Sequence, residues 1–569
     1  MKHHLVTRWL AIVLAMALSL SSPALYANSG RTPLQAENGM VSSSSQLASD
    51  VGSNILQQGG NAIDAAVATA FALAVTWPSA GNIGGGGFMI YHGEDGHATA
   101  FDFREKAPLA ATERMYINDD DEVVNNHRSL LSVGVPGTVA GMYKAHQELG
   151  QLPWALLVQP AIDLARSGIP ITGALRNGFQ RNQSYWEEYP SSGAVFLKED
   201  GSQYSLGDTW RQPDLADTLE LIRDHGRDGF YRGQNAERLV RFMEDNGGII
   251  TEEDLARYEA IEREPIRSTY RGHEIIGMPP PSSGGVTMAQ MFNILEGFDL
   301  TEMGHNSADY LHVLTESMRR AYANRAEHLG DSDFNPDLPL ERMLSKDYAD
   351  TLRASIDMDR ASESEPMDFA NRYESEDTTH YSVVDEEGNM VSVTYTLEQS
   401  YGSRIVVEGG GYLLNNEMGD FNPYPGDTNE FGRIGTPPNL IAPEKRMLSS
   451  MSPTIVAQDG KPLMAIGSPG GRTIINTTMQ VILNVIDHGM NVAEAIESPR
   501  IHHQWLPDVT SFENRGFSPD TIGLYEEKGH ELRRRGTQGS AMGVYHNRES
   551  GLYLGGADSR SGDSAVVGY

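Results

Sequence analysis

Residues 377–398 read Asp-Thr-Thr-His-Tyr-Ser-Val-Val-Asp-Glu-Glu-Gly-Asn-Met-Val-Ser-Val-Thr-Tyr-Thr-Leu-Glu. This stretch predicts a β-hairpin, because apolar and polar residues alternate in two arms around the loop Glu386-Glu387-Gly388, whose glycine supplies a positive φ. Counting the register back from that loop, Thr378 faces Thr396 on the same side of the sheet. Their Cβ atoms are then expected to lie roughly 5 Å apart.

The facing threonines have two interpretations. A hydroxyl held beside a second hydroxyl at the start of a strand is a suitable position for a nucleophile. The alternative is an ordinary cross-strand pair, because Thr is common in strands and Thr–Thr pairs stabilise sheets. On the hairpin alone the ordinary pair is favoured, and the rest of the chain has to decide between them.

Composition excludes several classes of protein. The chain has 569 residues, enough for a large core or several domains, and contains no cysteine. Disulfides, thiolate metal sites and cysteine catalysis are therefore excluded. A formal charge of −33 and the lack of a basic cluster argue against a nucleic-acid partner.

The N-terminus has the pattern of a secretory signal peptide over residues 1–27. Lys2 and Arg8 form a basic start, residues 10–20 are apolar, and Ala27 is a small residue at the expected cleavage site. The apolar run is short for a membrane span, so an uncleaved anchor is the lesser alternative. We expect a periplasmic or secreted protein with no membrane attachment after signal removal.

The chain between these segments predicts helices over residues 49–74, 286–297, 307–328 and 473–487. Four glycines at 84–87 lead into a strand without a following Lys-Ser/Thr, so they indicate close backbone packing rather than a nucleotide site. Residues 355–377 are acidic and poor in apolar residues, which predicts an exposed linker. Short alternating strands and turns begin at Thr378.

Several separate motifs occur in order along the chain. They are the glycine-rich residues 81–88, Asp102-Phe103-Arg104-Glu105, Val135-Pro136-Gly137, residues 279–285 (Pro-Pro-Pro-Ser-Ser-Gly-Gly), Thr378-Thr379-His380-Tyr381-Ser382, residues 415–421 (Asn-Asn-Glu-Met-Gly-Asp-Phe), Ser449-Ser450-Met451-Ser452-Pro453-Thr454, Pro469-Gly470-Gly471, Asp558-Ser559-Arg560 and the terminal Gly568-Tyr569. With these motifs the chain resembles the γ-glutamyltranspeptidases (γ-glutamyltransferases) of the N-terminal-nucleophile hydrolase superfamily, over nearly its whole length after the signal.

The resemblance implies a precursor that cleaves itself before a threonine. Here the cleaved bond would be Asp377–Thr378. The products would be a large subunit, 28–377, and a small subunit, 378–569, which stay associated without a disulfide through one shared core. The implied fold is an α+β four-layer αββα sandwich built jointly by both chains.

The resemblance also implies a mechanism centred on Thr378. The freed α-amino group, with a reference pKa of roughly 7.7–8.0, acts as the base for its own hydroxyl. Thr396 would orient that hydroxyl. The Gly470 and Gly471 amides resemble the family's oxyanion hole, where only residues without side chains let the backbone approach closely. Without the resemblance, an ordinary turn explains these glycines equally well.

The remaining site residues would hold the charged end of a γ-glutamyl group. Arg104 would bind its α-carboxylate, with Ser449 and Ser450 as further donors. Asp420 would bind the α-ammonium, helped by Glu417 and Glu398, although on its own Asp420 would be taken for a surface turn acid. This pairing selects amino-acid amides over plain amides.

Two positions depart from the pattern of many members. Glu398 stands where many have Asn, and Phe431, in a lid-like stretch at 422–443, stands where some have Tyr. The Tyr–Asn latch of those members therefore cannot form here. No cofactor is implied, and His380, His502 and His503 lack ligand spacing, so we expect core or surface histidines and no metal.

The predicted function is γ-glutamyl transfer to amino acids or peptides, and hydrolysis, on glutathione-like substrates. Expected partners are these small molecules and the two subunits of one precursor. One alternative is a related amidase, such as a glutaryl or cephalosporin acylase or a poly-γ-glutamate depolymerase; glutaryl substrates lack the ammonium that Asp420 would bind. A second alternative is an exported, unprocessed solute-binding protein that is not an enzyme.

Overall fold

The computed structural model describes residues 25–27, 32–124, 126–364, 378–425 and 436–569. The predicted hairpin is present: β11 (Thr379–Val384) and β12 (Met390–Thr396) are antiparallel, with Thr379 opposite Tyr395 and Val384 opposite Met390. Gly388 has a φ of 92° in the connecting loop. The register predicted from the loop is therefore confirmed.

Two large antiparallel sheets carry the fold within the described residues. The first has the order β1 (Leu25–Ala27), β20 (Ala565–Gly568), β3 (Met40–Ser43), β11, β12, β4 (Gly86–His92), β5 (Ala98–Phe103), β8 (Ile261–Arg263). The second has the order β2 (Leu34–Ala36), β19 (Leu552–Ala557), β18 (Met542–Asn547), β14 (Lys461–Gly467), β13 (Thr454–Gln458), β10 (His273–Gly277), β9 (Ile266–Tyr270). Smaller sheets join β15 (Ile501–His502), β16 (Thr510–Glu513) and β17 (Leu532–Arg535), and β6 (Ile169–Pro170) with β7 (Thr209–Trp210).

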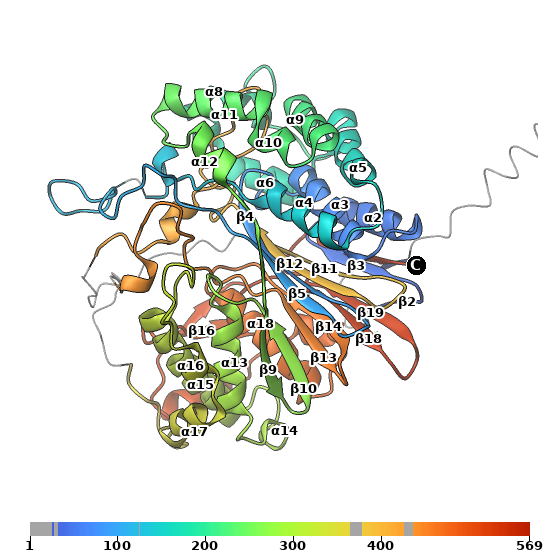
Figure 1. Cartoon of the computed structure of the whole chain (residues 1–569). Coiled ribbons are helices and arrows are strands. Elements are labelled where there is room, and N and C mark those ends of the chain that lie inside the picture. The colour runs from blue at the N-terminus through green and yellow to red at the C-terminus, as the bar shows by residue number, and fades with distance from the viewer. Residues whose placement is uncertain (1–24, 28–31, 125, 365–377, 426–435) are drawn as a thin grey trace, which may run out of the picture.

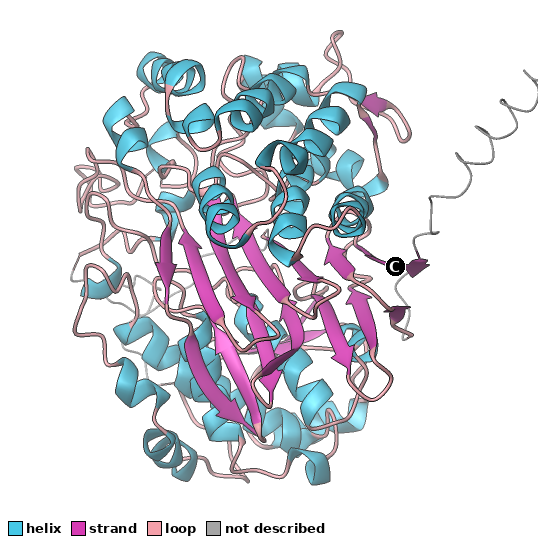
Figure 2. Ribbon diagram, turned by 45° about the vertical axis from the view of Figure 1, so that its right-hand side comes forward, coloured by secondary structure: helices cyan, strands magenta, loops and turns pink. Residues whose placement is uncertain are grey.

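Helices cover the outer face of each sheet, as Figures 1 and 2 show. On the first sheet and around it are α2 (Gln46–Gln57), α3 (Ala62–Thr76), α4 (Thr138–Leu149), α5 (Trp154–Ser167), α6 (Gly173–Arg181), α7 (Gln183–Glu188), α8 (Pro190–Phe196), α9 (Pro213–His225), α10 (Asp228–Tyr231), α11 (Gly233–Asn246) and α12 (Glu252–Arg257). On and around the second are α13 (Gly284–Leu295), α14 (Leu300–Met303), α15 (Ala308–His328), α16 (Leu340–Leu344), α17 (Lys346–Ala354), α18 (Thr473–Ile486), α19 (Val492–Glu497) and α20 (Pro519–Glu527). Short 3-10 turns are η1 (Leu130–Ser132), η2 (Glu417–Asp420) and η3 (Pro437–Asn439).

The inner faces of the two sheets pack on each other. Their shared core contains Phe88 and Ile90 of the first sheet and Ile455, Ala465 and Val544 of the second, all buried. Two further apolar cores lie between each sheet and its helices. The predicted four-layer αββα sandwich of the α+β class is therefore confirmed.

Helix α3 fixes the hairpin from the outer side. Its fifteen residues are all buried, and a capping box of Asn61 and Asp64 begins it. The hydroxyls of Tyr381 and Tyr395, on the two hairpin strands, donate to the Ala66 and Ala70 carbonyls at 3.0 and 2.9 Å. These bonds tie the strands that carry the facing threonines to a rigid support.

The single helix predicted over 49–74 is wrong, because the chain forms α2 and α3 with a break between them. Gly59, with a φ of 87°, ends the first helix, and Asn61 begins the second. The other predicted helices correspond to α13, α15 and α18, each within a few residues of the expected ends.

The linker predicted over 355–377 is only partly described, since residues 365–377 lie outside the described part. The linker residues just before position 365 are held by hydrogen bonds to the rest of the protein. Ser362 and Ser364 donate backbone hydrogen bonds to Glu316 (3.1 Å) and Asp508 (2.7 Å). Glu316 is fully buried and pairs with Arg319 and Arg320 on α15, so the described part of the linker is attached to a buried ion-pair cluster.

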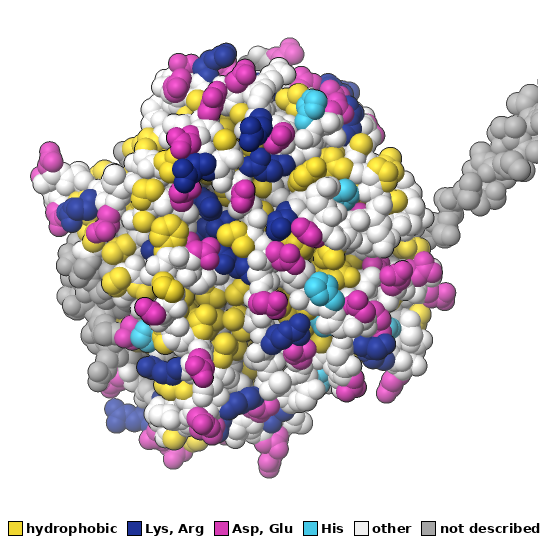
Figure 3. Space-filling view, in the orientation of Figure 1, with side chains coloured by type: hydrophobic (Ala, Val, Ile, Leu, Met, Phe, Trp, Pro, Cys, Tyr) yellow, Lys and Arg dark blue, Asp and Glu magenta, His cyan; other side chains and the backbone are white. Residues whose placement is uncertain are grey.

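Most of the predicted signal peptide, residues 1–24, lies outside the described part, while Leu25–Ala27 pairs with β20. Among the described helices, none has the length and apolar character needed to cross a bilayer. On the face in Figure 3, acidic and basic side chains are interspersed rather than gathered by sign.

Candidate active site

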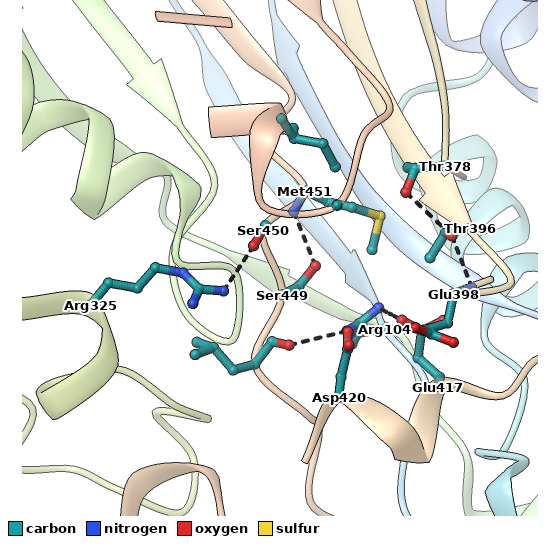
Figure 4. Close-up of a pocket in the computed structure, with 13 residues that line it drawn as sticks. Arg104, Arg325, Thr378, Thr396, Glu398, Glu417, Asp420, Ser449, Ser450 and Met451 are labelled. Carbon is teal, nitrogen blue, oxygen red and sulfur yellow. Dashed lines mark hydrogen bonds and ion pairs between the residues drawn. The ribbon is translucent and has the colours of Figure 1, made fainter. Parts of the chain in front are cut away.

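Thr378 lies immediately before β11, and Thr396 is the last residue of β12. The Thr378 hydroxyl points to the Thr396 hydroxyl, with 3.5 Å between the two oxygens (Figure 4). Thr396 Oγ1 also accepts a hydrogen bond from the Glu398 backbone amide at 2.9 Å. The predicted facing pair is thus present, and both side chains are buried.

The start of β11 is held by buried hydrogen bonds on either side of its axis. The Thr379 and Ser44 hydroxyls lie 2.9 Å apart. The His380 ring lies between the Thr394 and Ser382 hydroxyls, at 2.8 and 3.0 Å, and complete burial lowers its pKa to about 3. His380 is therefore a neutral core residue that orders the strand, which is one of the two environments, core or surface, expected for it.

Gly470 and Gly471 form the turn that precedes α18. Their φ values are 131° and 55°, a region that favours glycine. A Cβ atom at Gly470 would lie 2.4 Å from Thr473 Oγ1. Among the described residues neither glycine amide donates a hydrogen bond, and Gly471 lines the same pocket as Thr378. Two amide donors are thus available in this turn, and the residue of one of them, Gly471, lines the pocket of Thr378.

Arg104, directly after β5, lies on the opposite wall of this pocket. Its guanidinium pairs with Glu417 and, at 2.5 Å, with Asp420 of η2, and it donates to the Met447 and Leu448 carbonyls at 3.3 and 3.2 Å. Burial lowers the pKa of Arg104, but the neighbouring carboxylates more than offset this effect, so its pKa is raised. The group stays a cation throughout the working pH range.

Acidic groups outnumber the cation on this wall. Glu105 and Glu417 are fully buried, and burial raises the pKa of Glu105 to about 8 and that of Glu417 well above its usual value. Asp420 and Glu398 line the pocket as well. A second positive charge entering the pocket would therefore meet Asp420 and Glu398, and it would lower the raised pKa of the buried acids and favour their ionised form.

Ser449 and Ser450 complete the wall through a loop that is paired with the turn at residues 279–285. The Ser449 amide donates to the Pro281 carbonyl, and the Ser449 carbonyl accepts from the Ser283 amide, at 2.9 and 2.8 Å. Ser450 Oγ accepts from Arg325 at 2.8 Å, and Arg325 also donates to Ser283 Oγ. The serines are thus held in place by a buried cation.

Arg325 and His127 were not predicted from the sequence. Arg325 lies on the apolar face of α15 that Met318, Ala321 and Tyr322 define by their helical spacing. A cation on an apolar helix face indicates a buried charge, so the sequence pattern could have identified Arg325. His127 comes from a loop, and its Nδ1 lies 3.3 Å from the Glu398 carboxylate. No periodic pattern surrounds His127, so the sequence carried no signal for it.

The pocket brings the predicted residues together from distant parts of the chain. Its lining includes Arg104, Thr378, Thr396, Glu398, Glu417, Asp420, Ser449, Ser450 and Gly471, with Gly470 next in the chain. The cavity they enclose is ≈ 30 Å³, close to the size of one water. Asp377 and Phe431 lie outside the described residues, as does the middle of the lid-like stretch at 422–443.

One group of side chains has metal-ligand spacing among the described residues: His312, Glu316 and His530. The two histidine rings are already hydrogen-bonded to each other at 2.7 Å, and the Glu316 carboxylate forms ion pairs with Arg319 and Arg320. His502 is bonded to Asn476 and His503 to Asp508. These contacts suit a buried polar core better than a cation.

Comparison with known proteins identifies the family. The profile of the gamma-glutamyltranspeptidase family matches residues 48–568. The chain belongs to the gamma-glutamyltranspeptidase family. A glutathione hydrolase proenzyme of Escherichia coli (strain K12) is 47% identical over 544 residues, covering 94% of this chain and 93% of the relative.

Acylases are also similar to this gamma-glutamyltranspeptidase family member. The acylase ACY 1 proenzyme of Pseudomonas sp. (strain SE83) is 39% identical over 479 residues, 83% of each chain. The crystal structure of a cephalosporin acylase from Bacillus halodurans superposes with a TM-score of 0.84 at 27% identity, covering 97% of this chain and 99% of that one.

Proposed function

We propose that this protein is a γ-glutamyltransferase and hydrolase that cleaves the γ-glutamyl amide bond of glutathione and related compounds. The observation that carries the proposal is one pocket in which the Thr378–Thr396 hydroxyl pair faces a buried cation, Arg104, flanked by acids. A nucleophile and binding groups for both charges of an amino acid are thus found at one place. The similarity to a glutathione hydrolase proenzyme supports the same activity.

Substrate binding would exchange one ion pair for two. Arg104 and Asp420 are paired with each other, and the ≈ 30 Å³ cavity is too small for a γ-glutamyl group, so this contact must open. The substrate carboxylate then takes the guanidinium, and its ammonium takes Asp420. The charge of the pocket is unchanged by this exchange, because a zwitterion has both signs.

Catalysis would begin at Thr378 Oγ1. After cleavage of the Asp377–Thr378 bond, the α-amino group of Thr378 accepts the hydroxyl proton while Thr396 holds the oxygen. Oγ1 attacks the γ-carbonyl carbon, and the Gly470 and Gly471 amides stabilise the oxyanion. On collapse the C–N bond breaks, the protonated α-amino group donates its proton to the leaving amine, and a γ-glutamyl ester remains, which water or an acceptor amine removes.

The precursor would be exported and cut into subunits of residues 28–377 and 378–569. The signal pattern at 1–27 supports export to the periplasm or the medium. The similarity to a glutathione hydrolase proenzyme supports the processing of a precursor.

The test of this proposal is replacement of the nucleophile. Thr378→Ala is expected to remain a single chain near 62 kDa and to lack activity, since no hydroxyl is present to attack. The wild type should give two fragments, the smaller beginning at Thr378 by N-terminal sequencing, and Thr378→Ser should retain some processing. A processed Thr378→Ala protein would show that another residue is the nucleophile.

An acylase is the second candidate, favoured by the similarity to the Pseudomonas and Bacillus halodurans proteins. A glutaryl group has the carboxylate but no ammonium, so it would leave Asp420 and Glu417 without a substrate partner. Unpaired buried acids disfavour that substrate. Comparison of kcat/KM for γ-glutamyl and glutaryl anilides distinguishes the two activities.

A further inference from the structure

A second cleft lies on the other side of Thr378. It has a volume of ≈ 590 Å³, and Thr378 lines both this cleft and the ≈ 30 Å³ pocket of Arg104. A volume of this size is in the range of small-molecule sites, and is ample for a dipeptide. Thr378 is thus shared by a small pocket with the donor-binding charges and a larger open cleft.

The charge of the second cleft differs from that of the whole protein. Although the chain has 77 acidic residues against 44 Lys and Arg, the described residues lining this cleft include two arginines and no acid. Arg560 is neutralised by Glu513 and Asp558, at 2.7 and 3.0 Å. Arg181 is exposed and forms no ion pair with a described residue. The cleft therefore presents one available positive charge.

The position of Arg181 is fixed by its surroundings. It is the last residue of α6, and the hydroxyl of Thr172, the N-cap residue before this helix, donates to Asp563 at 2.5 Å. The next residue, Asn182, donates to the Gly178 carbonyl and accepts from Arg404, both at 2.9 Å. The backbone that carries the guanidinium is thus attached at both ends of the helix.

The cleft also has apolar walls. Half-buried Trp77 and the buried Tyr401 line it, and the Tyr401 ring packs edge-on against Trp186 and Phe196 with centroids 5.3 and 5.6 Å apart. An aromatic surface on the cleft that Arg181 also lines suits a short peptide that ends in a carboxylate.

We infer that this cleft binds the peptide portion beyond the scissile bond, with Arg181 binding its C-terminal carboxylate. The inference rests on the proposed function and deepens it. The same cleft takes the leaving dipeptide of a glutathione-like donor and the dipeptide that accepts the acyl group. Arg181 is a specificity-determining residue for both.

The transfer step requires the acceptor amine to approach Thr378 from this cleft. Its nitrogen forms a bond to the acyl carbon, and the ester bond to Thr378 Oγ1 breaks, with the electron pair going to the oxygen. The proton of the amine passes through the α-amino group of Thr378 to Oγ1. The products are a γ-glutamyl peptide and the free threonine hydroxyl.

The test compares acceptors that differ only in the terminal carboxylate. With a γ-glutamyl anilide as donor, whose leaving group has no carboxylate, the acceptors are a dipeptide and its C-terminal amide. The wild type should show a lower acceptor KM for the acid than for the amide. Arg181→Gln should remove this preference, raising the KM for the acid about 10-fold, as expected for one charge-assisted hydrogen bond.

The controls separate the possible outcomes. Arg181→Lys should keep most of the preference, and Arg241→Gln, an exposed arginine of α11 outside the cleft, should keep all of it. Hydrolysis of the anilide without acceptor should be unchanged in every variant. Equal KM changes for acid and amide, or no change for either, would overturn the inference. A wild type that cannot cleave the anilide would instead overturn the proposed function on which it rests.

Discussion

The central residue of the candidate donor pocket is Arg104, because its charge is surrounded by more acids than it can balance. Glu417 and Asp420 contact it directly, and Glu105 lies 3.9 Å from it. Burying a lone cation or a lone acid is costly, but a zwitterion brings a partner for each. The excess of acid explains how a pocket that holds an arginine can also select an ammonium.

Asp420→Asn tests this selection. The amide cannot balance an ammonium, so kcat/KM for a γ-glutamyl anilide should fall about 100-fold, corresponding to the lower part of the 2–5 kcal/mol range for truncating one partner of a buried charge pair. The value for a glutaryl anilide, which has no ammonium, should fall much less. Steady-state kinetics of the processed variant measure both.

Asp121→Asn is the matched control, since this acid is 62% exposed and pairs only with the exposed Arg114. Its kinetics should be those of the wild type. An equal loss on both anilides in Asp420→Asn would mean that Asp420 acts by holding Arg104 and not by binding substrate.

The facing threonines were predictable because a hairpin has a fixed register, so a loop that begins eight residues after Thr378 determines which residue Thr378 faces. The pairing of Arg104 with Asp420 was not predictable from the sequence. That pairing depends on how η2 packs against the end of β5, and no local pattern encodes it. His127 beside Glu398 was missed for the same reason.

At the scale of elements, the contact between α4 and β5 positions Arg104. Gly141 of α4 packs on Phe103, the residue before Arg104, and a Cβ atom there would lie 2.2 Å from the Phe103 ring. The helix can approach the strand this closely only because residue 141 lacks a side chain. The arginine therefore owes its place to a glycine in a helix remote in sequence.

Gly141→Ala should lower the free energy of unfolding by about 1–3 kcal/mol through overpacking. It should also raise the KM for γ-glutamyl donors, since displacement of Phe103 moves Arg104. Urea unfolding and steady-state kinetics measure the two effects.

Gly523→Ala supplies the comparison, because Gly523 is also inside a helix and has no atom within 4 Å of an added Cβ. That change should stabilise the protein by up to about 1 kcal/mol through helix propensity alone. If the free energy of unfolding changed equally in both variants, the close approach of α4 to Phe103 would make no contribution to stability.

Helices and strands were predictable where a single hydrophobic periodicity runs through the segment, and less predictable where tertiary contacts determine the conformation. α15 was expected over 307–328 and is found at Ala308–His328. The break between α2 and α3 was missed although Gln57-Gln58-Gly59-Gly60-Asn61 interrupts the apolar spacing and supplies both a helix-stop and an N-cap signal. The anchoring of Ser362 and Ser364 was missed too, since a polar acidic sequence predicts exposure unless its partners are known.

At the scale of the molecule, both proposed subunits contribute strands to each sheet, and strands of one subunit lie between strands of the other. In the first sheet β20, β11 and β12 come from residues after 377, and β3, β4, β5 and β8 from residues before it. In the second, β13, β14, β18 and β19 lie between β2 and β10. Cleavage would leave these ladders intact, so no disulfide is needed to keep the parts together.

The processed protein should therefore elute as one species of the precursor's size and unfold in a single urea transition detected by several probes. The uncleaved Thr378→Ala variant is the control and should have the same elution volume. A small fragment that separates without denaturant would contradict one shared core.

The place of β11 has a consequence for the chain end that cleavage creates. New termini commonly fray, because they have no neighbours and gain conformational entropy by moving. β11 is instead an interior strand between β3 and β12. Its first residue, Thr379, follows the new terminus at Thr378 and is hydrogen-bonded to Ser44. The entropy of ordering this amine would be lost when the precursor folds, before the amine exists. Processing would thus release a catalytic base that is already immobilised, with no conformational search left to make.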